Sequence, residues 1–276
     1  MKPDTTPELK APDGATDCHM HVYDDRYTPV ATAPFKPPQA PSAGYLEMQA
    51  RLGLQRVVVV QPAAYGFDNR CTLEAMAALG PGARGIAVIP PAVDEAEMLR
   101  LDRAGVRGVR FFMLKGGLLP WHSLEAMAAR IAPLGWHINL QLDGRDLPQH
   151  MPVLRRLPLK LVIDHNGKFL EPVGTADPAF RCLLELLDAG RTWIKLAAPY
   201  ETSKIGPPRY DDVSALARTY VRTHPERCLW ASNWPHPNQD PQPSSAAMLD
   251  MLLFWAEDDV TRRRILVDNP AMVYGY

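Results

Sequence analysis

Short apolar segments alternate with longer amphipathic ones along almost the whole chain, and this alternation restricts the fold more than any other feature. Eight apolar runs rich in β-branched residues recur, most of them at intervals of roughly 25–40 residues, the length of one βα unit. They are Thr16–Tyr23, Arg56–Gln61, Arg84–Ile89, Val106–Phe112, His137–Leu142, Leu159–His165, Thr192–Ala197 and Arg227–Ala231. Near-continuous apolar strands such as Val57–Val60 are typical of a parallel sheet that is covered on both faces.

The segments between these runs have the periodicity of amphipathic helices. The clearest are Asn69–Leu79, Ala92–Ala104, Ser123–Leu134, Pro178–Leu187 and Asp211–His224. Eight strands that alternate with helices within about 250 residues predict an α/β fold, a (β/α)8 TIM-like barrel. We expect a single domain over residues 1–276, with strand one from about residue 15 and a C-terminal helical extension after Asp258. An open doubly wound sheet is the alternative, but the chain has neither Gly-x-Gly-x-x-Gly after the first strand nor a Walker A loop.

Charge and cysteine content narrow the class of partner. Thirty Lys and Arg residues balance 31 Asp and Glu residues, with no basic stripe, so neither nucleic acid nor an anionic membrane is an expected partner. The four cysteines lack CxxC spacing. No signal peptide and no membrane span of ~20 apolar residues are visible. We therefore expect a cytoplasmic protein with reduced thiols that acts on a small molecule; the sequence leaves its oligomeric state open.

Two proline-rich segments, 29–41 and 235–243, follow predicted strands. Both are predicted to be long loops within the domain and not linkers between domains. Long loops inside a compact domain are often functional, and a rigid surface connection is the alternative.

Polar and titratable side chains collect where the predicted strands end. His19 and His21 lie two residues apart on the first strand and therefore point to the same face. Active sites of (β/α)8 barrels lie at the C-terminal ends of the strands. The other strand ends supply Gln61, Tyr65, Arg110, Gln141, Asp143, Asp164, His165, Lys168, Lys195, Tyr200, Glu201, Asn233 and His236. A gathering of such groups at one rim indicates a ligand site.

Five motifs link the chain to a known family. They are Asp17–Val22 with its two histidines, Gly105–Phe111, Asp164–Phe169, Trp234–Pro237 and Val267–Pro270. At these motifs the chain resembles the amidohydrolase superfamily, in particular the branch that contains 2-pyrone-4,6-dicarboxylate lactonase and D-galactarolactone isomerase. The resemblance spans nearly the whole chain and implies a distorted (β/α)8 barrel, in agreement with the periodicity.

The resemblance also raises the question of a metal. In metal-dependent members, the strand-one histidines, later histidines and a strand-eight aspartate hold a divalent ion. This chain keeps His19, His21 and His165, but it has Gln141 where a histidine is wanted and Asn233 in place of the aspartate. The lactonase branch resembles a family that works without metal, so we expect no cofactor. Zinc held by the three histidines is the alternative.

The resemblance implies a metal-independent hydrolase that opens a small carboxylated lactone. The expected catalytic residues are His19, His21, His165 and Asn233. Because an amide cannot usefully accept a proton, the general base is expected among these histidines or His236. A lactone isomerase of the D-galactarolactone isomerase type, which carries Asn at this position and uses a substrate hydroxyl as nucleophile, is the alternative. A non-catalytic barrel that binds small acids is a third possibility.

Arg110, at the end of the fourth strand, is most simply an anchor for a substrate carboxylate through its bidentate guanidinium. A structural ion pair with Asp143 is the competing interpretation. The remaining predicted substrate contacts are Gln61, Tyr65, Gln141, Asp143, Lys168, Tyr200 and His236.

Overall fold

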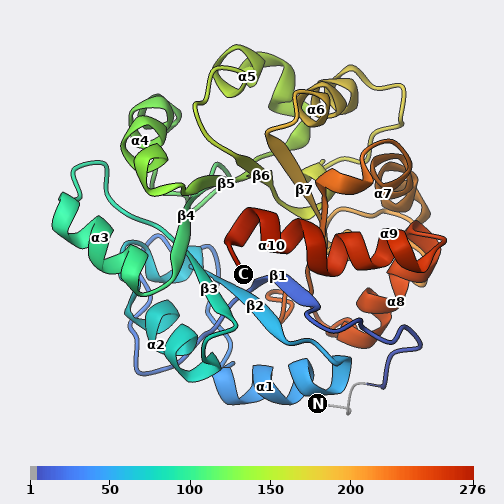
Figure 1. Cartoon of the computed structure of the whole chain (residues 1–276), viewed down its shortest axis with the longest axis horizontal. Coiled ribbons are helices and arrows are strands. Elements are labelled where there is room, and N and C mark those ends of the chain that lie inside the picture. Colours follow the sequence, from blue (N-terminus) through green and yellow to red (C-terminus); the bar gives the residue numbers. More distant parts are fainter. Residues whose placement is uncertain (1–4) are drawn as a thin grey trace.

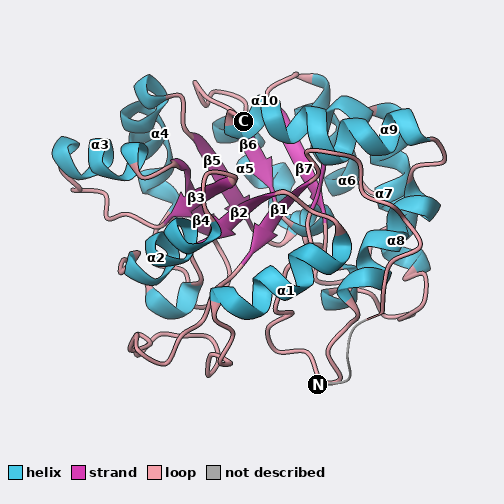
Figure 2. Cartoon of the chain, turned by 60° about the horizontal axis from the view of Figure 1, so that its bottom comes forward, coloured by secondary structure: helices cyan, strands magenta, loops and turns pink. Residues whose placement is uncertain are grey.

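The computed structural model describes residues 5–276 and forms one sheet of eight parallel strands in the order β1 to β8. The strands are β1 Thr16–Met20, β2 Arg56–Val60, β3 Ala83–Ala87, β4 Val106–Phe112, β5 His137–Gln141, β6 Leu161–Ile163, β7 Thr192–Leu196 and β8 Cys228–Trp230. Figures 1 and 2 show these strands at the centre with helices around them. The predicted (β/α)8 barrel is confirmed, because sequential neighbours pair throughout.

The helices follow the strands as the periodicity predicts. They are α1 Ser42–Leu52, α2 Arg70–Leu79, α3 Glu95–Arg103, α4 Leu124–Ile131, α5 Leu147–Leu154, α6 Pro178–Asp188, α7 Asp211–Thr223, α8 Ser245–Trp255, α9 Asp259–Arg263 and α10 Asn269–Tyr274. Helix α6 shows why they begin where they do. The Asp177 carboxylate accepts a hydrogen bond from the amide of Ala179, and Pro178 stands in the first turn.

The sixth strand ends earlier than the apolar run predicts. β6 stops at Ile163, and residues 165–167 form a 3₁₀ turn. His165, Asn166 and Lys168 all have positive φ, between 48° and 56°. The backbone therefore turns sharply at the C-terminal end of the barrel, where active-site groups of this fold lie.

The first and last strands are joined by a carboxylate and not by a regular ladder. Asp17 accepts hydrogen bonds from the Ser232 amide at 3.0 Å, the Ser232 hydroxyl at 2.5 Å and the Tyr45 hydroxyl at 3.1 Å. Beside it, the Asn233 amide donates to the His19 carbonyl at 2.9 Å. We call Asp17, Ser232 and Tyr45 the β1–β8 clasp. The clasp places Asn233 next to the strand-one histidines.

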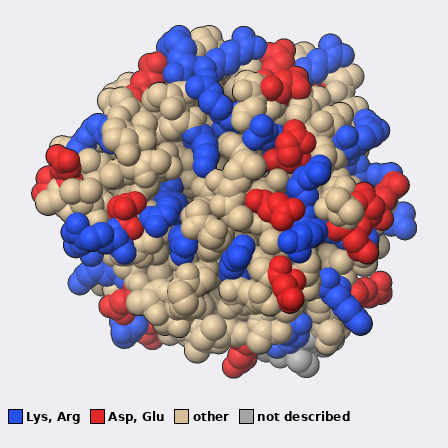
Figure 3. Space-filling view, in the orientation of Figure 1, with Lys and Arg blue, Asp and Glu red and all other residues tan. Residues whose placement is uncertain are grey.

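The C-terminal helices cover the N-terminal end of the barrel, where α10 lies across the strands in Figure 1. The Tyr276 hydroxyl donates to the Val57 carbonyl at 2.9 Å, and Arg84 donates to the Gly275 carbonyl at 2.9 Å. Acidic and basic side chains are interspersed over the face drawn in Figure 3. None of the helices within residues 5–276 is long and apolar enough to cross a bilayer.

Candidate active site

A cavity of about 280 Å³ lies at the C-terminal ends of the strands. Both proline-rich loops contribute to its wall, through Pro34 and Phe35 from the first and Pro237, Asn238 and Gln239 from the second. Its other polar lining residues are His21, Arg110, Gln141, His165, Lys168, Glu201 and Asn233. The two long loops are therefore part of the site.

Three imidazoles gather at the base of this site. Burial lowers the pKa of His19, His21 and His165 well below the ordinary histidine value, so all three are neutral at pH 7. Nδ1 of His21 lies 2.7 Å from the Val60 carbonyl and must carry the proton. Nε2 of His21 then accepts from Nε2 of His19 at 3.1 Å. The hydrogen-bond network thus assigns both tautomers and leaves Nδ1 of His19 as an acceptor.

A buried lysine stands at the start of this hydrogen-bond chain. Nζ of Lys195 lies 3.1 Å from Nδ1 of His19, 3.1 Å from Oδ1 of Asp164 and 2.6 Å from Oδ1 of Asn139. These three acceptors match the three N–H groups of an ammonium. Burial by itself would raise the pKa of Asp164, but the Lys195 ammonium holds it well below its usual value. Asp164 and Lys195 therefore form a buried ion pair beneath the histidines.

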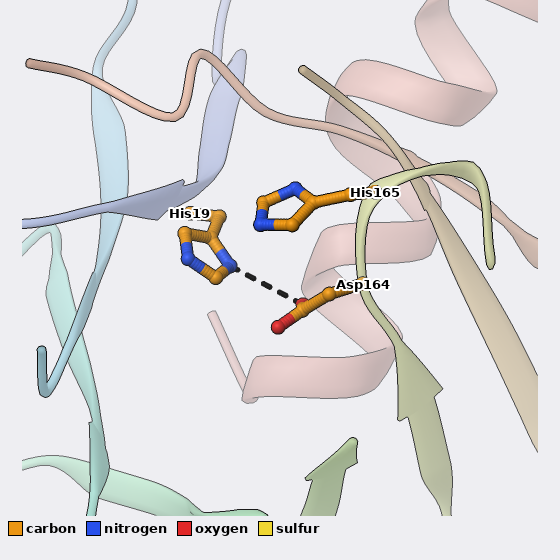
Figure 4. A group of neighbouring side chains, drawn as sticks. All are labelled: His19, Asp164 and His165. Atoms are coloured by element: carbon orange, nitrogen blue, oxygen red, sulfur yellow. Dashed lines mark hydrogen bonds and ion pairs between the residues drawn. The ribbon is translucent and has the colours of Figure 1, made fainter. Parts of the chain in front are cut away.

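The histidines and Asp164 have the composition of a metal site but not its arrangement. His19, Asp164 and His165 place one ligand atom each within 4.8 Å of one another (Figure 4). However, Nδ1 of His19 and Oδ1 of Asp164 each already lie 3.1 Å from the Lys195 ammonium. A divalent ion bound there would face this positive charge at short range. The side chains as arranged do not fit a resident metal.

Arg110 is a buried cation that forms no ion pair with any residue of the described part of the chain. Its guanidinium is 4% exposed and donates to the Gln61 carbonyl and to Oε1 of Gln141, each at 2.9 Å. Its Nε has no hydrogen-bond partner among residues 5–276. Asp143 pairs instead with Arg145, so the alternative of an Arg110–Asp143 ion pair is wrong. A buried, unpaired guanidinium in a cavity wall favours an anionic ligand.

Beside the histidines, the loops after β6, β7 and β8 bring together a lysine, a glutamate and an amide. The Lys168 ammonium forms an ion pair with Oε2 of Glu201. Nδ2 of Asn233 donates to Oε1 of Glu201 at 3.2 Å and to the Tyr200 hydroxyl at 3.0 Å. Burial lowers the pKa of Lys168 to about 8, so its ammonium form predominates at pH 7. Among the described residues, Glu201 is the one carboxylate that lines the cavity.

Six of the predicted site residues do not line the cavity. They are His19, Gln61, Tyr65, Asp143, Tyr200 and His236. The Tyr200 hydroxyl accepts a hydrogen bond from Nδ2 of Asn233 at 3.0 Å and lies 2.7 Å from Nδ1 of His236. His19 lies behind His21. These residues position the lining groups.

The other three residues hold loops. The Gln61 side chain bonds to the Thr72 hydroxyl and to two backbone carbonyls. The Tyr65 hydroxyl bonds to the backbone of Asp24. Because the polar atoms of these side chains are engaged within the protein, their positions do not support the predicted substrate contacts, and the Arg145 ion pair has the same consequence for Asp143.

Sequence reasoning overlooked Asn139 and assigned no role to Lys195 or Glu201. The signal for Asn139 was the period of two on β5, which puts it on the same face as Gln141. Lys195 and Glu201 were visible at the seventh strand end, but their partners come from other strands.

The fold and cavity define the class: a (β/α)8-barrel protein with a cation-lined ligand site at the C-terminal ends of its strands. A family model described as "Amidohydrolase" matches residues 16–276. The chain is 34% identical over 275 residues to a D-galactarolactone isomerase of Agrobacterium fabrum, covering 98% of this chain and 94% of the relative. It is also 34% identical over 281 residues to a 2-pyrone-4,6-dicarboxylate hydrolase of Comamonas testosteroni, covering 97% and 92%.

A solved structure of similar sequence has the same fold. The ligand-free crystal structure of an Agrobacterium tumefaciens protein superimposes with a TM-score of 0.92, at 34% identity and 98% coverage of both chains. A 4-sulfomuconolactone hydrolase of Rhizobium radiobacter is 32% identical over 96% of this chain and 91% of the relative. The chain belongs to the amidohydrolase family.

Proposed function

We propose that the protein is an enzyme that opens a small carboxylated lactone by attack of an oxygen nucleophile on the ester carbonyl. The observation that carries this proposal is Arg110, a buried guanidinium in the cavity wall that has no acidic partner within residues 5–276. A substrate carboxylate would supply the missing charge in bidentate geometry. The cavity, about 280 Å³, is the size of a small organic acid's site. The named relatives act on or are named for lactones, which supports the same substrate class.

Two cavity groups are suited to stabilise the charge that develops on the carbonyl oxygen. His165 lines the cavity, and its buried Nδ1 has no hydrogen-bond partner among residues 5–276. Lys168 presents an ammonium from the same turn after β6. Donors fixed in place before the reaction stabilise an oxyanion without a reorganisation cost. His21, by contrast, uses both ring nitrogens within the protein, and so it shapes the site.

The nucleophile is water in our first candidate reaction, which is hydrolysis. The second candidate is isomerisation, in which a hydroxyl of the substrate attacks and the ring size is exchanged. Asn233 favours this second candidate, because its amide stands where a hydrolytic carboxylate would activate water and can only orient a hydroxyl.

A panel of carboxylated lactones followed by NMR separates the candidates. Hydrolysis yields an open hydroxy acid and releases a proton, whereas isomerisation yields a second lactone at constant pH. Absence of turnover, with tight binding of small acids, would favour a binding protein. If Asn233→Asp gains hydrolysis while it loses ring exchange, the isomerase assignment is supported.

We further propose that the reaction proceeds without a metal. The Lys195 ammonium already interacts with Nδ1 of His19 and Oδ1 of Asp164, two atoms that a metal would need as ligands. Elemental analysis of purified protein should find less than stoichiometric zinc, and activity should survive dialysis against a chelator. Stoichiometric zinc, with activity lost on its removal and restored on its return, would overturn this proposal.

The free thiols of Cys18, Cys71, Cys182 and Cys228 support the cytoplasm, a reducing compartment, as the location of the protein.

A further inference from the structure

The proposed reaction needs a group that takes the proton of the attacking hydroxyl, and the histidines are poorly placed for this role. His19 and His21 use both ring nitrogens in hydrogen bonds. His236 does the same with Tyr200 and Ser245 and does not line the cavity. His165 has a free nitrogen, but burial among cations makes it a weak base at pH 7. The expected histidine base is therefore not supported by the geometry.

We propose that Glu201 is the general base of this site, and that Asn233 and Lys168 hold its carboxylate in position. This inference rests on the proposed reaction at a lactone carbonyl. Glu201 is the one carboxylate that lines the cavity among residues 5–276, and it stands beside the amide that replaces the strand-eight aspartate. The carboxylate that Asn233 lacks is thus supplied from the neighbouring loop after β7.

The Glu201 carboxylate can still accept a proton while it is bound to Asn233 and Lys168. Asn233 donates to Oε1 and Lys168 to Oε2. An ionised carboxylate has about four lone-pair sites, so each oxygen keeps one for the proton of the nucleophile. Since Asn233 is braced by Tyr200, the carboxylate is held between two neighbouring loops.

The proton balance of the step closes within the site. Glu201 accepts the proton as the nucleophile oxygen forms its bond to the carbonyl carbon. The ring C–O bond then breaks, and the electron pair stays on the leaving oxygen. Glu201 returns the proton to that oxygen and is regenerated as a carboxylate. The same cycle serves water or a substrate hydroxyl, so Glu201 is required in both candidate reactions.

The competing role for Glu201 is a counter-ion that neutralises Lys168. A double-mutant cycle separates the two roles. Wild type, Glu201→Gln, Lys168→Met and the double variant are compared on the lactone that the wild type turns over. For a base, Glu201→Gln lowers kcat by roughly 10²–10⁴-fold with little change in KM, in either the wild-type or the Lys168→Met background. For a counter-ion, the double variant equals Lys168→Met, and this result would overturn the proposal.

One control variant and one further pair of variants complete the test. Glu171 forms an exposed ion pair with Lys204 at 3.4 Å, so Glu171→Gln is the matched control and should keep wild-type kcat. If Glu201→Gln does not fold, Glu201→Asp and Glu201→Asn replace it, because they share one size and differ in proton acceptance. Asp is expected to be at least tenfold more active than Asn, and equal activity would overturn the proposal. Absence of wild-type turnover would overturn the proposed function itself, whereas an active wild type with an active Glu201→Gln overturns this inference alone.

Discussion

At the scale of single residues, the site is defined by cations whose charges the protein leaves only partly compensated. Arg110 is the clearest case, because its two bonded partners, Gln61 and Gln141, are neutral. A protein gains little stability from such a group. We attribute its presence in the cavity wall to binding of a substrate carboxylate.

We expect Arg110→Met to raise KM for a carboxylated lactone by roughly 10- to 100-fold, since the ligand loses charge-assisted hydrogen bonds. The melting temperature should stay the same or rise, because a buried unpaired charge is removed. Steady-state kinetics and a thermal melt measure the two effects. A large loss of stability with unchanged KM would show that Arg110 is structural.

Lys168 should set the alkaline limit of activity. Burial lowers its pKa to about 8 from the usual 10.5, so the ammonium loses its proton as the pH rises through 8, and kcat/KM should fall in that range. Lys168→Arg keeps its charge, and its activity should extend to higher pH. The pH profiles of kcat/KM between 6 and 10 provide the comparison. An unchanged alkaline limb in Lys168→Arg would assign the limit to another group.

At the scale of elements, the β1–β8 clasp matters most, because its side chains join β1 to the end of β8 alongside two backbone hydrogen bonds. Asp17→Ala leaves the amides of Ser232 and His19 and the Tyr45 hydroxyl without their acceptor. We expect the free energy of unfolding to fall by roughly 3 kcal/mol. Activity should fall as well, since Asn233 follows Ser232 directly. Chemical denaturation tests the stability, and Ser244→Ala, which removes the N-cap of α8, serves as a milder control.

The clasp also predicts a pH dependence. Burial raises the pKa of Asp17 from 3.8 to about 6, so the folded state binds this proton more tightly than the unfolded state. The stability that the protonated Asp17 carboxyl group contributes to the folded state is therefore present below pH 4 and is lost as the pH rises through 6. Relative to the wild type, Asp17→Asn should gain stability between pH 4 and 7, by about 1.4 kcal/mol per unit of pKa shift. A constant difference across this range would contradict the prediction.

At the scale of the whole molecule, the two ends of the barrel have separate tasks. The C-terminal end carries the cavity, and the N-terminal end is closed by α10 and Tyr276. Deleting residues 274–276 removes buried Tyr274 and the Tyr276 contact to Val57. We expect a loss of about 3–5 kcal/mol in stability, with kcat/KM unchanged well below the melting temperature. A loss of activity in the folded variant would show that the two ends are coupled.

Much of this organisation is local, and local features can be derived from sequence. Hydrophobic periodicity and the spacing of strands are properties of contiguous residues, so they predicted the barrel, and strand ends predicted His21, Arg110, His165 and Lys168 in the cavity lining. The predicted end of the sixth strand was wrong. The backbone leaves β6 after Ile163 and enters a turn with positive φ angles, which apolar periodicity does not reveal.

The sequence by itself determined the fold, the rim that carries the site and the absence of a strand-eight carboxylate. Only the tertiary structure decided how these groups pair. Lys195 meets His19 across 176 positions, and Glu201 meets Asn233 and Lys168 from two other loops. Protonation states and hydrogen-bond partners depend on burial and on distances of about 3 Å between side chains far apart in the chain. Such distances exist only once the barrel has closed.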